Sequence, residues 1–162
     1  MKYCRPRLNF RGGWLLAVLT AITTTPVIAE TPNFSTFSLA PDFEQIKGKV
    51  TGYTGGSFSL SALSNRDRDR KACIGFADPK PDHIMILEKD FSHLKILVNS
   101  RGFDTTLLIQ GPNDNIIRCG DDTGKSKDAS IDDLDWKKGT YRIWVGTFNA
   151  GVKRNYTITV KQ

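Results

Sequence analysis

The most constraining feature of this sequence is a series of short apolar segments separated by turn residues. It is clearest between Asp104 and Phe148. There, Thr105–Gln110 is an apolar run that ends at the turn sequence Gly111–Asp114, and Tyr141–Phe148 is the clearest strand-like segment. No segment shows a sustained helical period with capping residues. Eight or nine such strands, with turns about every ten residues, predict an all-β fold: an antiparallel, jelly-roll-like β-sandwich.

Alternation of side chains predicts which faces of these strands are buried. In residues 57–63, apolar residues alternate with serines, and we expect a half-buried hairpin with the extended segment around residues 46–50. Tyr141, Ile143 and Val145 share one face of their strand, because successive side chains point to opposite sides. We expect that face to lie in the core.

The N-terminal segment has the three parts of a secretory signal peptide. Its basic head is followed by the apolar run Trp14–Ile22, which is too short to span a bilayer. Val27–Ala29 places small or modest residues at the cleavage position. A retained membrane anchor is the alternative, but Thr23–Pro26 interrupts the apolar run. We therefore expect residues 1–29 to be cleaved off and the protein to be secreted or periplasmic, without a membrane attachment.

Removal of that segment changes what the charge implies. The chain has 23 Lys+Arg and 17 Asp+Glu, and the segment carries four of the basic residues and none of the acidic ones. The remaining 19 basic and 17 acidic residues give a net charge of only +2, which does not favour nucleic-acid binding. The 133 residues that remain are enough for one domain. We expect an extended lead-in over residues 30–42, ordered along a sheet edge or loosely held, and a sandwich over 43–162.

Two cysteines, Cys73 and Cys119, remain after the predicted cleavage. In an oxidising compartment, an isolated pair is most simply a disulfide. Closing a loop of 46 positions suggests about 4 kcal/mol of stabilisation from loop entropy. Two free thiols or a catalytic thiol are the alternatives, and no neighbouring residues favour a thiol active site.

Five pieces follow one another in the C-terminal part: Asp104–Leu107, the turn Gly111–Asn113, the pair Asp121–Asp122, Ile131 and the strand Gly139–Val145. The order of these pieces resembles the bacterial pre-peptidase C-terminal (PPC) domain. The resemblance covers about the last eighty residues well and the preceding part poorly. The order of the pieces is more specific than any piece alone.

The resemblance implies a secreted, jelly-roll-like sandwich that is usually not catalytic. Members of the family are often attached to proteases and are linked to substrate attachment, secretion or enzyme maturation, and several bind calcium. This chain departs from that setting, because the 133 residues leave no room for a catalytic domain. Any role toward an enzyme would therefore be exerted in trans.

Six aspartates lie within 15 residues and form the candidate metal site: Asp121, Asp122, Asp128, Asp132, Asp133 and Asp135. A hairpin could bring Asp104 beside Asp121 and Asp122, and Ca²⁺ prefers six to eight oxygen ligands. The spacing is not that of an EF-hand. The residues alone favour a solvated Asx turn, and the resemblance makes Ca²⁺ binding an equal alternative. The predicted ligands are Asp104, Asp121, Asp122 and Asp128.

A second candidate site is aromatic. Arg142, Trp144 and Phe148 share the face of their strand opposite the predicted core. If that face is exposed, it forms a flat platform suited to sugar rings or peptide. The alternative is that a loop or the lead-in covers it, because large aromatic side chains are usually at least partly buried.

Catalysis is not indicated by any motif. The two histidines, His83 and His93, each follow a polar residue, but neighbouring residues on a strand point to opposite faces. Nucleophile-elbow, zinc-protease and phosphate-loop motifs are absent from the sequence. Nothing fixes a nucleophile next to a base, so we expect a protein that is not an enzyme.

These observations favour a secreted, non-catalytic binding module. Its acidic loop would bind Ca²⁺, and its ligand would be extracellular polysaccharide or another exported protein. The alternative is an accessory protein (an inhibitor, chaperone or maturation factor) that acts in trans on a secreted peptidase. The sequence leaves the oligomeric state open.

Overall fold

The computed structural model describes residues 1–2 and 30–162. The segment Thr31–Gln162 forms one compact unit, whereas most of the predicted signal peptide lies outside the described residues. In the part described, no helix is both long and apolar enough to cross a membrane. The strands are β1 Ser35–Leu39, β2 Lys49–Tyr53, β3 Phe58–Ser59, β4 Phe76–Ala77, β5 His83–Leu87, β6 Phe91–Asn99, β7 Thr105–Gln110, β8 Ile117–Gly120, β9 Asp122–Thr123, β10 Ser126–Trp136, β11 Gly139–Thr147 and β12 Asn155–Lys161, and one short 3-10 helix, η1, spans Leu60–Ala62.

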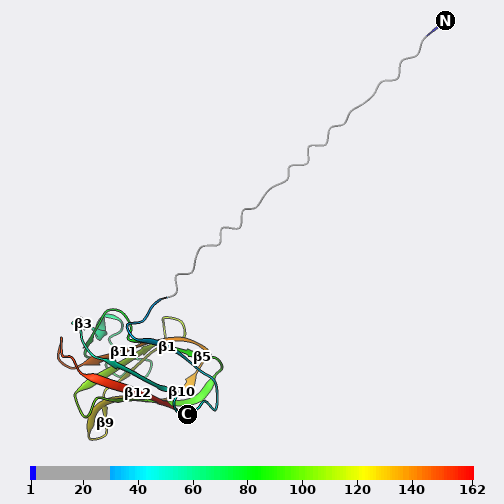
Figure 1. Ribbon diagram of the computed structural model, residues 1–162. Coiled ribbons are helices and arrows are strands. Elements are labelled where there is room, and N and C mark those ends of the chain that lie inside the picture. Colours follow the sequence, from blue (N-terminus) through cyan, green and yellow to red (C-terminus); the bar gives the residue numbers. More distant parts are fainter. Residues whose placement is uncertain (3–29) are drawn as a thin grey trace. The chain divides into compact units, whose positions relative to one another are not determined.

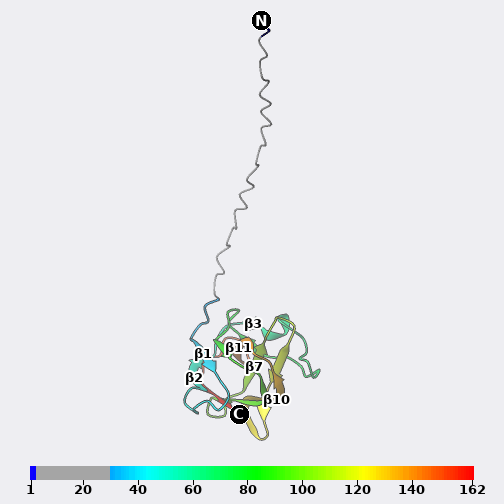
Figure 2. The ribbon, with the colours of Figure 1, turned by 90° about the vertical axis from the view of Figure 1, so that its right-hand side faces the viewer.

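The strands form two sheets that pack face to face, which confirms the β-sandwich. The seven-stranded sheet follows the order β1-β5-β11-β4-β3, with β7 paired to β11 and β8 paired to β7, and the five-stranded sheet follows β2-β12-β6-β10-β9. Figure 1 shows β1, β5 and β11 in one layer and β12, β10 and β9 in the other. The view in Figure 2 again separates β1, β11 and β7 from β10.

The core lies between the sheets because the strands alternate. In β12, Tyr156, Ile158 and Val160 are buried, whereas the residues between them are partly exposed. The same period appears in β6, and both strands contribute to one core cluster. Tyr141 and Val145 on β11 are fully buried in that cluster, as is Ile143 between them. The predicted core face of β11 is therefore confirmed.

The strands differ from the prediction in number and direction. The described residues contain twelve strands rather than eight or nine, because β3, β4 and β9 have only two residues each and give no readable alternation. The predicted lead-in contains β1, which pairs in parallel with β5. It therefore lies along a sheet edge, the first of the two alternatives, and interrupts an otherwise antiparallel sandwich.

The predicted hairpin of residues 46–50 with residues 57–63 is wrong. β2 belongs to the five-stranded sheet, where it pairs with β12, whereas β3 pairs with β4 in the other sheet. After β3 the chain turns into η1. The alternation of apolar residues and serines predicted burial on one side but could not identify the partner strand, which lies far away in the sequence.

A second, smaller apolar cluster covers the outer side of the seven-stranded sheet. Leu108 and Trp144 are register partners on β7 and β11, and Leu60 and Ile117 pack against them. The predicted disulfide between Cys73 and Cys119 is present within this cluster. It attaches the segment between β3 and β4 to β8.

Candidate functional site

Three of the four predicted calcium ligands come together. Asp104, Asp121 and Asp122 each offer a carboxylate oxygen within 4.8 Å of the others. Burial, and then the charges of Asp122 and Asp104, raise the pKa of Asp121. Lys127 compensates part of this charge, because its Nζ lies 2.9 Å from Asp104 Oδ2. Calcium binding at this cluster stays a prediction.

Asp128 lies outside that cluster and has a different role. Its Oδ1 accepts hydrogen bonds from the backbone N–H and the hydroxyl of Ser100, and its Oδ2 accepts from the Gly102 N–H and the Ser126 hydroxyl. Burial opposes ionisation of Asp128, but these hydrogen bonds together lower its pKa. The oxygens that the prediction assigned to a metal instead hold the turn after β6, so we remove Asp128 from the predicted ligands.

The predicted aromatic platform does not form. Trp144 is only 3% exposed because the disulfide-linked segment covers it, and its Nε1–H donates to the Pro79 carbonyl at 3.3 Å. Arg142 forms an ion pair with Asp114, with 2.7 Å between Nη1 and Oδ1. Only Phe148 remains as an exposed large apolar side chain of the three. The alternative that a loop covers this face is therefore the correct one.

An open groove of about 840 Å³ lies at one end of the five-stranded sheet. Its walls come from β2, β12, the turn after β6 and the residue before β1. Four aromatic residues contribute: Phe34, Tyr53, Phe103 and Tyr156. The remaining lining residues are glycine, hydroxyl, amide and guanidinium groups: Thr51, Gly52, Asn99, Ser100, Arg101, Asn155 and Thr157.

A basic side chain stacks on each of two of these aromatic rings. The ammonium of Lys153 lies 3.9 Å from the centre of the Tyr53 ring, and the guanidinium of Arg154 lies 4.3 Å from that of Phe103. Tyr53 and Phe103 are each 45% exposed, so both rings remain accessible to a ligand. Phe34 meets Tyr53 edge to face, with ring centroids 4.8 Å apart. The groove thus combines aromatic rings with positive charge.

Local structure fixes the walls of the groove. Gly52 is opposite Tyr156 in the register of β2 and β12. A Cβ at this position would lie 2.6 Å from the Tyr156 hydroxyl and 2.8 Å from Phe34, so only glycine lets both rings pack against β2. The carboxylate of Asp128 holds the turn that carries Arg101 and Phe103 on the other side.

A buried polar chain lies beneath the groove. Ser35 Oγ is 2.8 Å from His83 Nδ1, and His83 Nε2 is 3.0 Å from the Tyr156 hydroxyl. The Tyr156 hydroxyl also forms a hydrogen bond with Asp82, whose Oδ2 accepts from the Val145 N–H at 2.8 Å. The chain links both sheets, because Tyr156 is on β12 and the other residues belong to the seven-stranded sheet or its approach.

Burial shifts the pKa values of the three titratable groups in this buried polar series. It raises the pKa of Asp82 to about 7, against the opposing hydrogen bonds from Val145, Asn33 and Tyr156. It lowers the pKa of His83 to about 4 and raises the pKa of Tyr156. His83 is fully buried and both of its ring nitrogens are hydrogen-bonded within the fold. It is therefore placed to stabilise the sandwich rather than to reach a substrate.

Sequence reasoning missed the groove because its residues come from four distant segments. Tyr53 and Thr51 have the parity of the exposed side of β2, and Asn155 and Thr157 have that of β12. This alternation was readable, but the pairing that places Tyr53 next to Asn155 was not. Phe34 lies in the predicted lead-in, and the sequence does not indicate which residues it packs against.

Comparison with known proteins gives fold-level likenesses only. No protein-family model matches the chain, and no curated protein matches it. Among solved structures, it is similar to the pre-peptidase C-terminal domain of a collagenase from Bacillus anthracis, with 13% identity and a TM-score of 0.45 over 82% of this chain and 100% of that one. It is also similar to CorA, a surface-associated copper-binding protein of Methylomicrobium album BG8, with 9% identity and a TM-score of 0.45 over 81% and 99%. The first is a domain of the family that the sequence motifs resemble.

Proposed function

We propose that this protein is an exported, non-catalytic binding module and that its ligand is an extracellular polysaccharide bound in the groove. The observation that supports this most is the lining of the groove, where exposed aromatic rings stand beside hydroxyl and amide groups. A concave site with an apolar surface and a few polar groups is the usual form of a small-ligand site.

The chemistry of the groove fits a sugar ring. A pyranose has a face of C–H bonds that can stack on Tyr53 or Phe103, which supply a large rigid contact surface. Its hydroxyl groups need partners that both donate and accept, as amides and hydroxyls do. Within the described residues, the side chains of Thr51, Thr157 and Asn155 make no hydrogen bond or ion pair, so they remain available to a ligand.

The groove is also preorganised. The Asp128 carboxylate holds one wall, and the packing of Phe34 and Tyr156 on Gly52 holds another. A ligand therefore does not have to order these walls, which reduces the entropic cost of binding.

An exported protein or peptidase as partner has weaker support. Such a partner usually needs a contiguous apolar patch. Among the described residues, the large exposed apolar side chains outside the groove are those of Ile46, Leu134 and Phe148, apart from the N-terminal methionine. Leu134 is on β10 of the five-stranded sheet, Phe148 follows β11 of the seven-stranded sheet, and Ile46 lies in the loop before β2. A role in trans on a peptidase therefore remains the alternative outcome of the experiment below.

The experiment is affinity electrophoresis and sedimentation of residues 30–162 with a polysaccharide panel of cellulose, chitin, xylan, dextran and polygalacturonate. Tyr53→Ala and Phe103→Ala should each weaken binding by about tenfold, because a lost aromatic contact is worth roughly 1 kcal/mol or more. Tyr53→Phe keeps the ring and should retain most of the affinity. Leu134→Ala removes an apolar side chain from β10 that is even more exposed, at 58%, and should change nothing.

Binding to no polysaccharide would overturn the proposal, as would binding that Tyr53→Ala and Phe103→Ala leave unchanged. Retention of an exported peptidase instead, with its activity altered, would favour the accessory role. Thermal unfolding of each variant shows whether a loss of binding comes from the groove or from loss of the fold.

A further inference from the structure

The outer face of the five-stranded sheet is open and carries positive charge. On β2, Lys49, Thr51 and Tyr53 are exposed, whereas the two residues between them are only partly so. On the neighbouring β12, Thr157, Thr159 and Lys161 share the outward parity, and on β6 the outward residues include Lys95 and Leu97. No described segment covers this face, as the partly or fully exposed state of these residues shows.

The register places these residues in rows that continue from the groove. Thr51 pairs with Thr157, and Thr157 pairs with Asn99; all three line the groove. The next row consists of Lys49, Thr159 and Leu97, and the row after that pairs Lys161 with Lys95. Rows two residues apart are separated by about 7 Å along the strands.

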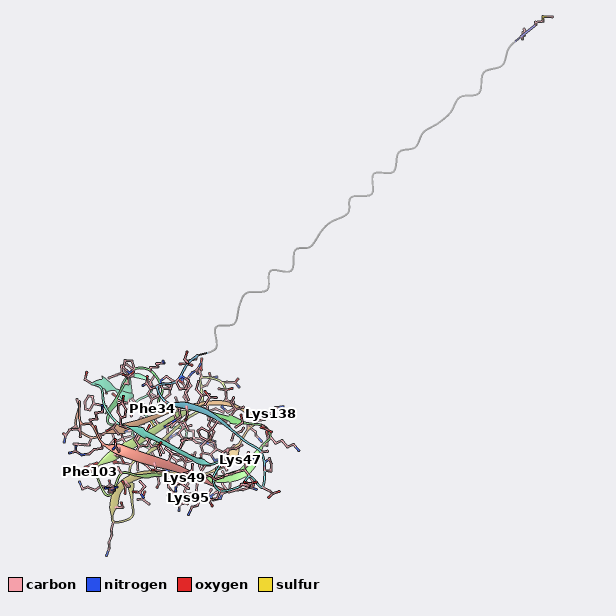
Figure 3. The ribbon with its side chains drawn as sticks, in the orientation of Figure 1. Phe34, Lys47, Lys49, Lys95, Phe103 and Lys138 are labelled. Carbon is pink, nitrogen blue, oxygen red and sulfur yellow. A yellow bond between two sulfur atoms is a disulfide. The ribbon has the colours of Figure 1, made fainter. Side chains whose placement is uncertain are left out.

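The lysines are therefore within reach of an extended ligand. A chain that leaves the groove along β12 meets the row of Lys49 after about 7 Å and that of Lys161 after about 13 Å. Figure 3 labels Lys49 and Lys95, which come from β2 and β6 of this sheet, and Phe103, which lies toward the other end of the sheet. We call the groove with Lys49, Lys95 and Lys161 the basic track.

More cations than anions lie along the basic track. Arg101 lines the groove, and Arg154 stacks on the Phe103 ring; Lys153 stacks on Tyr53 from a neighbouring pocket that it shares with Asp78. In the described part of the chain, no ion pair engages Lys49 or Lys161. Three aspartates lie nearby: Asp128, whose oxygens accept four hydrogen bonds, Asp132, which pairs with Lys95 and His93, and Asp42, which borders a small pocket with Lys161.

The excess of basic over acidic side chains is confined to this face of the protein. The chain without residues 1–29 has 19 basic and 17 acidic residues, so its net charge alone would not collect anions. Five basic side chains (Arg101, Arg154, Lys49, Lys95 and Lys161) against three acidic ones along one face instead create a local positive field, which raises the concentration of anionic ligands at that face.

We infer that the polysaccharide is anionic, with carboxylate or sulfate groups along its chain, and that it lies in the groove and along the basic track. This inference rests on the proposed function. Rings of the polymer contact Tyr53 and Phe103, and their anionic groups meet Arg101 and Arg154. The continuation of the polymer passes over the threonines of β12 toward Lys49 and Lys161.

The test compares polymers that differ only in charge. Polygalacturonate is paired with its methyl ester, and dextran sulfate with dextran, in EDTA so that bridging metal ions do not contribute. Affinity should be at least tenfold higher for one anionic polymer than for its uncharged partner, and should fall as salt is added. The pair that shows the difference identifies carboxylate or sulfate as the anionic group.

Variants then locate the contact. Lys49→Gln and Lys161→Gln should each weaken binding to the anionic polymer by about threefold, as expected for exposed charge contacts, and leave binding to the uncharged partner unchanged. Lys138→Gln is the matched control, because Lys138 is an exposed lysine beside β11 of the other sheet.

Each outcome distinguishes the two proposals. Equal affinity for charged and uncharged polymers overturns the anionic inference and leaves the groove as a neutral polysaccharide site. Charge-dependent binding that Lys138→Gln weakens as much as Lys49→Gln does overturns the basic track. Binding to neither pair, nor to the neutral panel, overturns the proposed function as well.

Discussion

The Nε2 atom of His83 lies 3.0 Å from the hydroxyl of Tyr156, and this contact joins the two sheets beneath the groove. A neutral imidazole that donates from Nε2 and accepts at Nδ1 satisfies every partner. Ser35 then donates to His83, His83 donates to Tyr156, and Tyr156 donates to Asp82. The hydrogen bonds of this series then all run in one direction, from Ser35 on β1 to the buried carboxyl group of Asp82.

Asp82 and His83 affect stability in opposite directions as the pH changes. Burial raises the pKa of Asp82 from 3.8 to about 7, so its contribution is complete below pH 3.8 and is lost as the pH rises to 7. Burial lowers the pKa of His83 from 6.5 to about 4, so its contribution is present above pH 6.5 and is lost as the pH falls to 4.

Replacement of Asp82 by Asn separates these contributions. Between pH 5 and pH 8 the native protein should lose roughly 3 kcal/mol relative to Asp82→Asn, because the wild-type carboxyl group must ionise in a buried site. Urea unfolding of both proteins at the two pH values measures this difference. Asp69→Asn, at an exposed position, is the control. Identical pH dependence in wild type and Asp82→Asn would show that Asp82 does not titrate in this range.

Sequence periodicity identified the local features of this fold and missed the long-range ones. The face of Tyr141 and Val145 was predicted because alternation depends only on neighbouring residues. The burial of Trp144 was not predicted, because it depends on where the segment between β3 and β4 packs on the sheet. The disulfide of Cys73 could be predicted from the number of cysteines, whereas prediction of the groove at Tyr53 required knowledge of the pairing of β2 with β12.

The buried ion pair of Arg118 and Asp133 provides a prediction with a neighbouring control. Arg118 Nε lies 2.6 Å from Asp133 Oδ2, and the guanidinium stacks over Trp136 at 4.0 Å. Asp133→Asn should cost about 3 kcal/mol of unfolding free energy, because it leaves a buried charge without its partner. Asp132→Asn breaks an exposed pair with Lys95 and should cost about 1 kcal/mol or less.

Chemical denaturation of the two variants measures both costs at one pH and salt concentration. A similar loss in each would mean that the Arg118 pair contributes no more than a surface ion pair. Circular dichroism of Asp133→Asn shows whether the native fold is still present before unfolding.

The disulfide should stabilise the chain through the length of the loop that it closes. Cys73 and Cys119 are 46 positions apart, so reduction or the double substitution to Ala should cost about 4 kcal/mol. The small cluster under the bridge should loosen first, which makes Trp144 more accessible to acrylamide in a Trp136→Phe background. Unfolding with and without dithiothreitol measures the cost, and the double variant should not respond to the reductant. Two alkylatable thiols in the oxidised protein would contradict the pairing.

Export predicts a new N-terminus. The three-part pattern of residues 1–29 places cleavage after Ala29, so mass spectrometry of protein from the periplasm or medium should find Glu30 first. An Ala29→Phe variant, with a bulky residue at the cleavage position, should accumulate uncut chain in the membrane fraction. Recovery of full-length wild-type protein from the medium would contradict the signal-peptide prediction.

Calcium provides the last prediction, and Lys127 makes it specific. The ammonium of Lys127 and a bound cation would compete for Asp104, while Asp121 and Asp122 complete the cluster. If the cluster binds Ca²⁺, calcium at a hundredfold excess over its dissociation constant should stabilise the protein by about 2.7 kcal/mol relative to EDTA. Asp121→Asn with Asp122→Asn should abolish this response. Lys127→Gln should move it to lower calcium concentrations, because the competing charge is gone.

Asp128→Asn distinguishes the cluster from the rest of the acidic loop. It loosens the turn after β6 and should lower stability in calcium and in EDTA alike, since Asp128 is not near enough to share the ion. Thermal unfolding of the four proteins across a calcium titration gives all of these comparisons. An unchanged midpoint for wild type and Lys127→Gln would assign Asp104, Asp121 and Asp122 to ordinary turn chemistry, with Lys127 as their counter-charge.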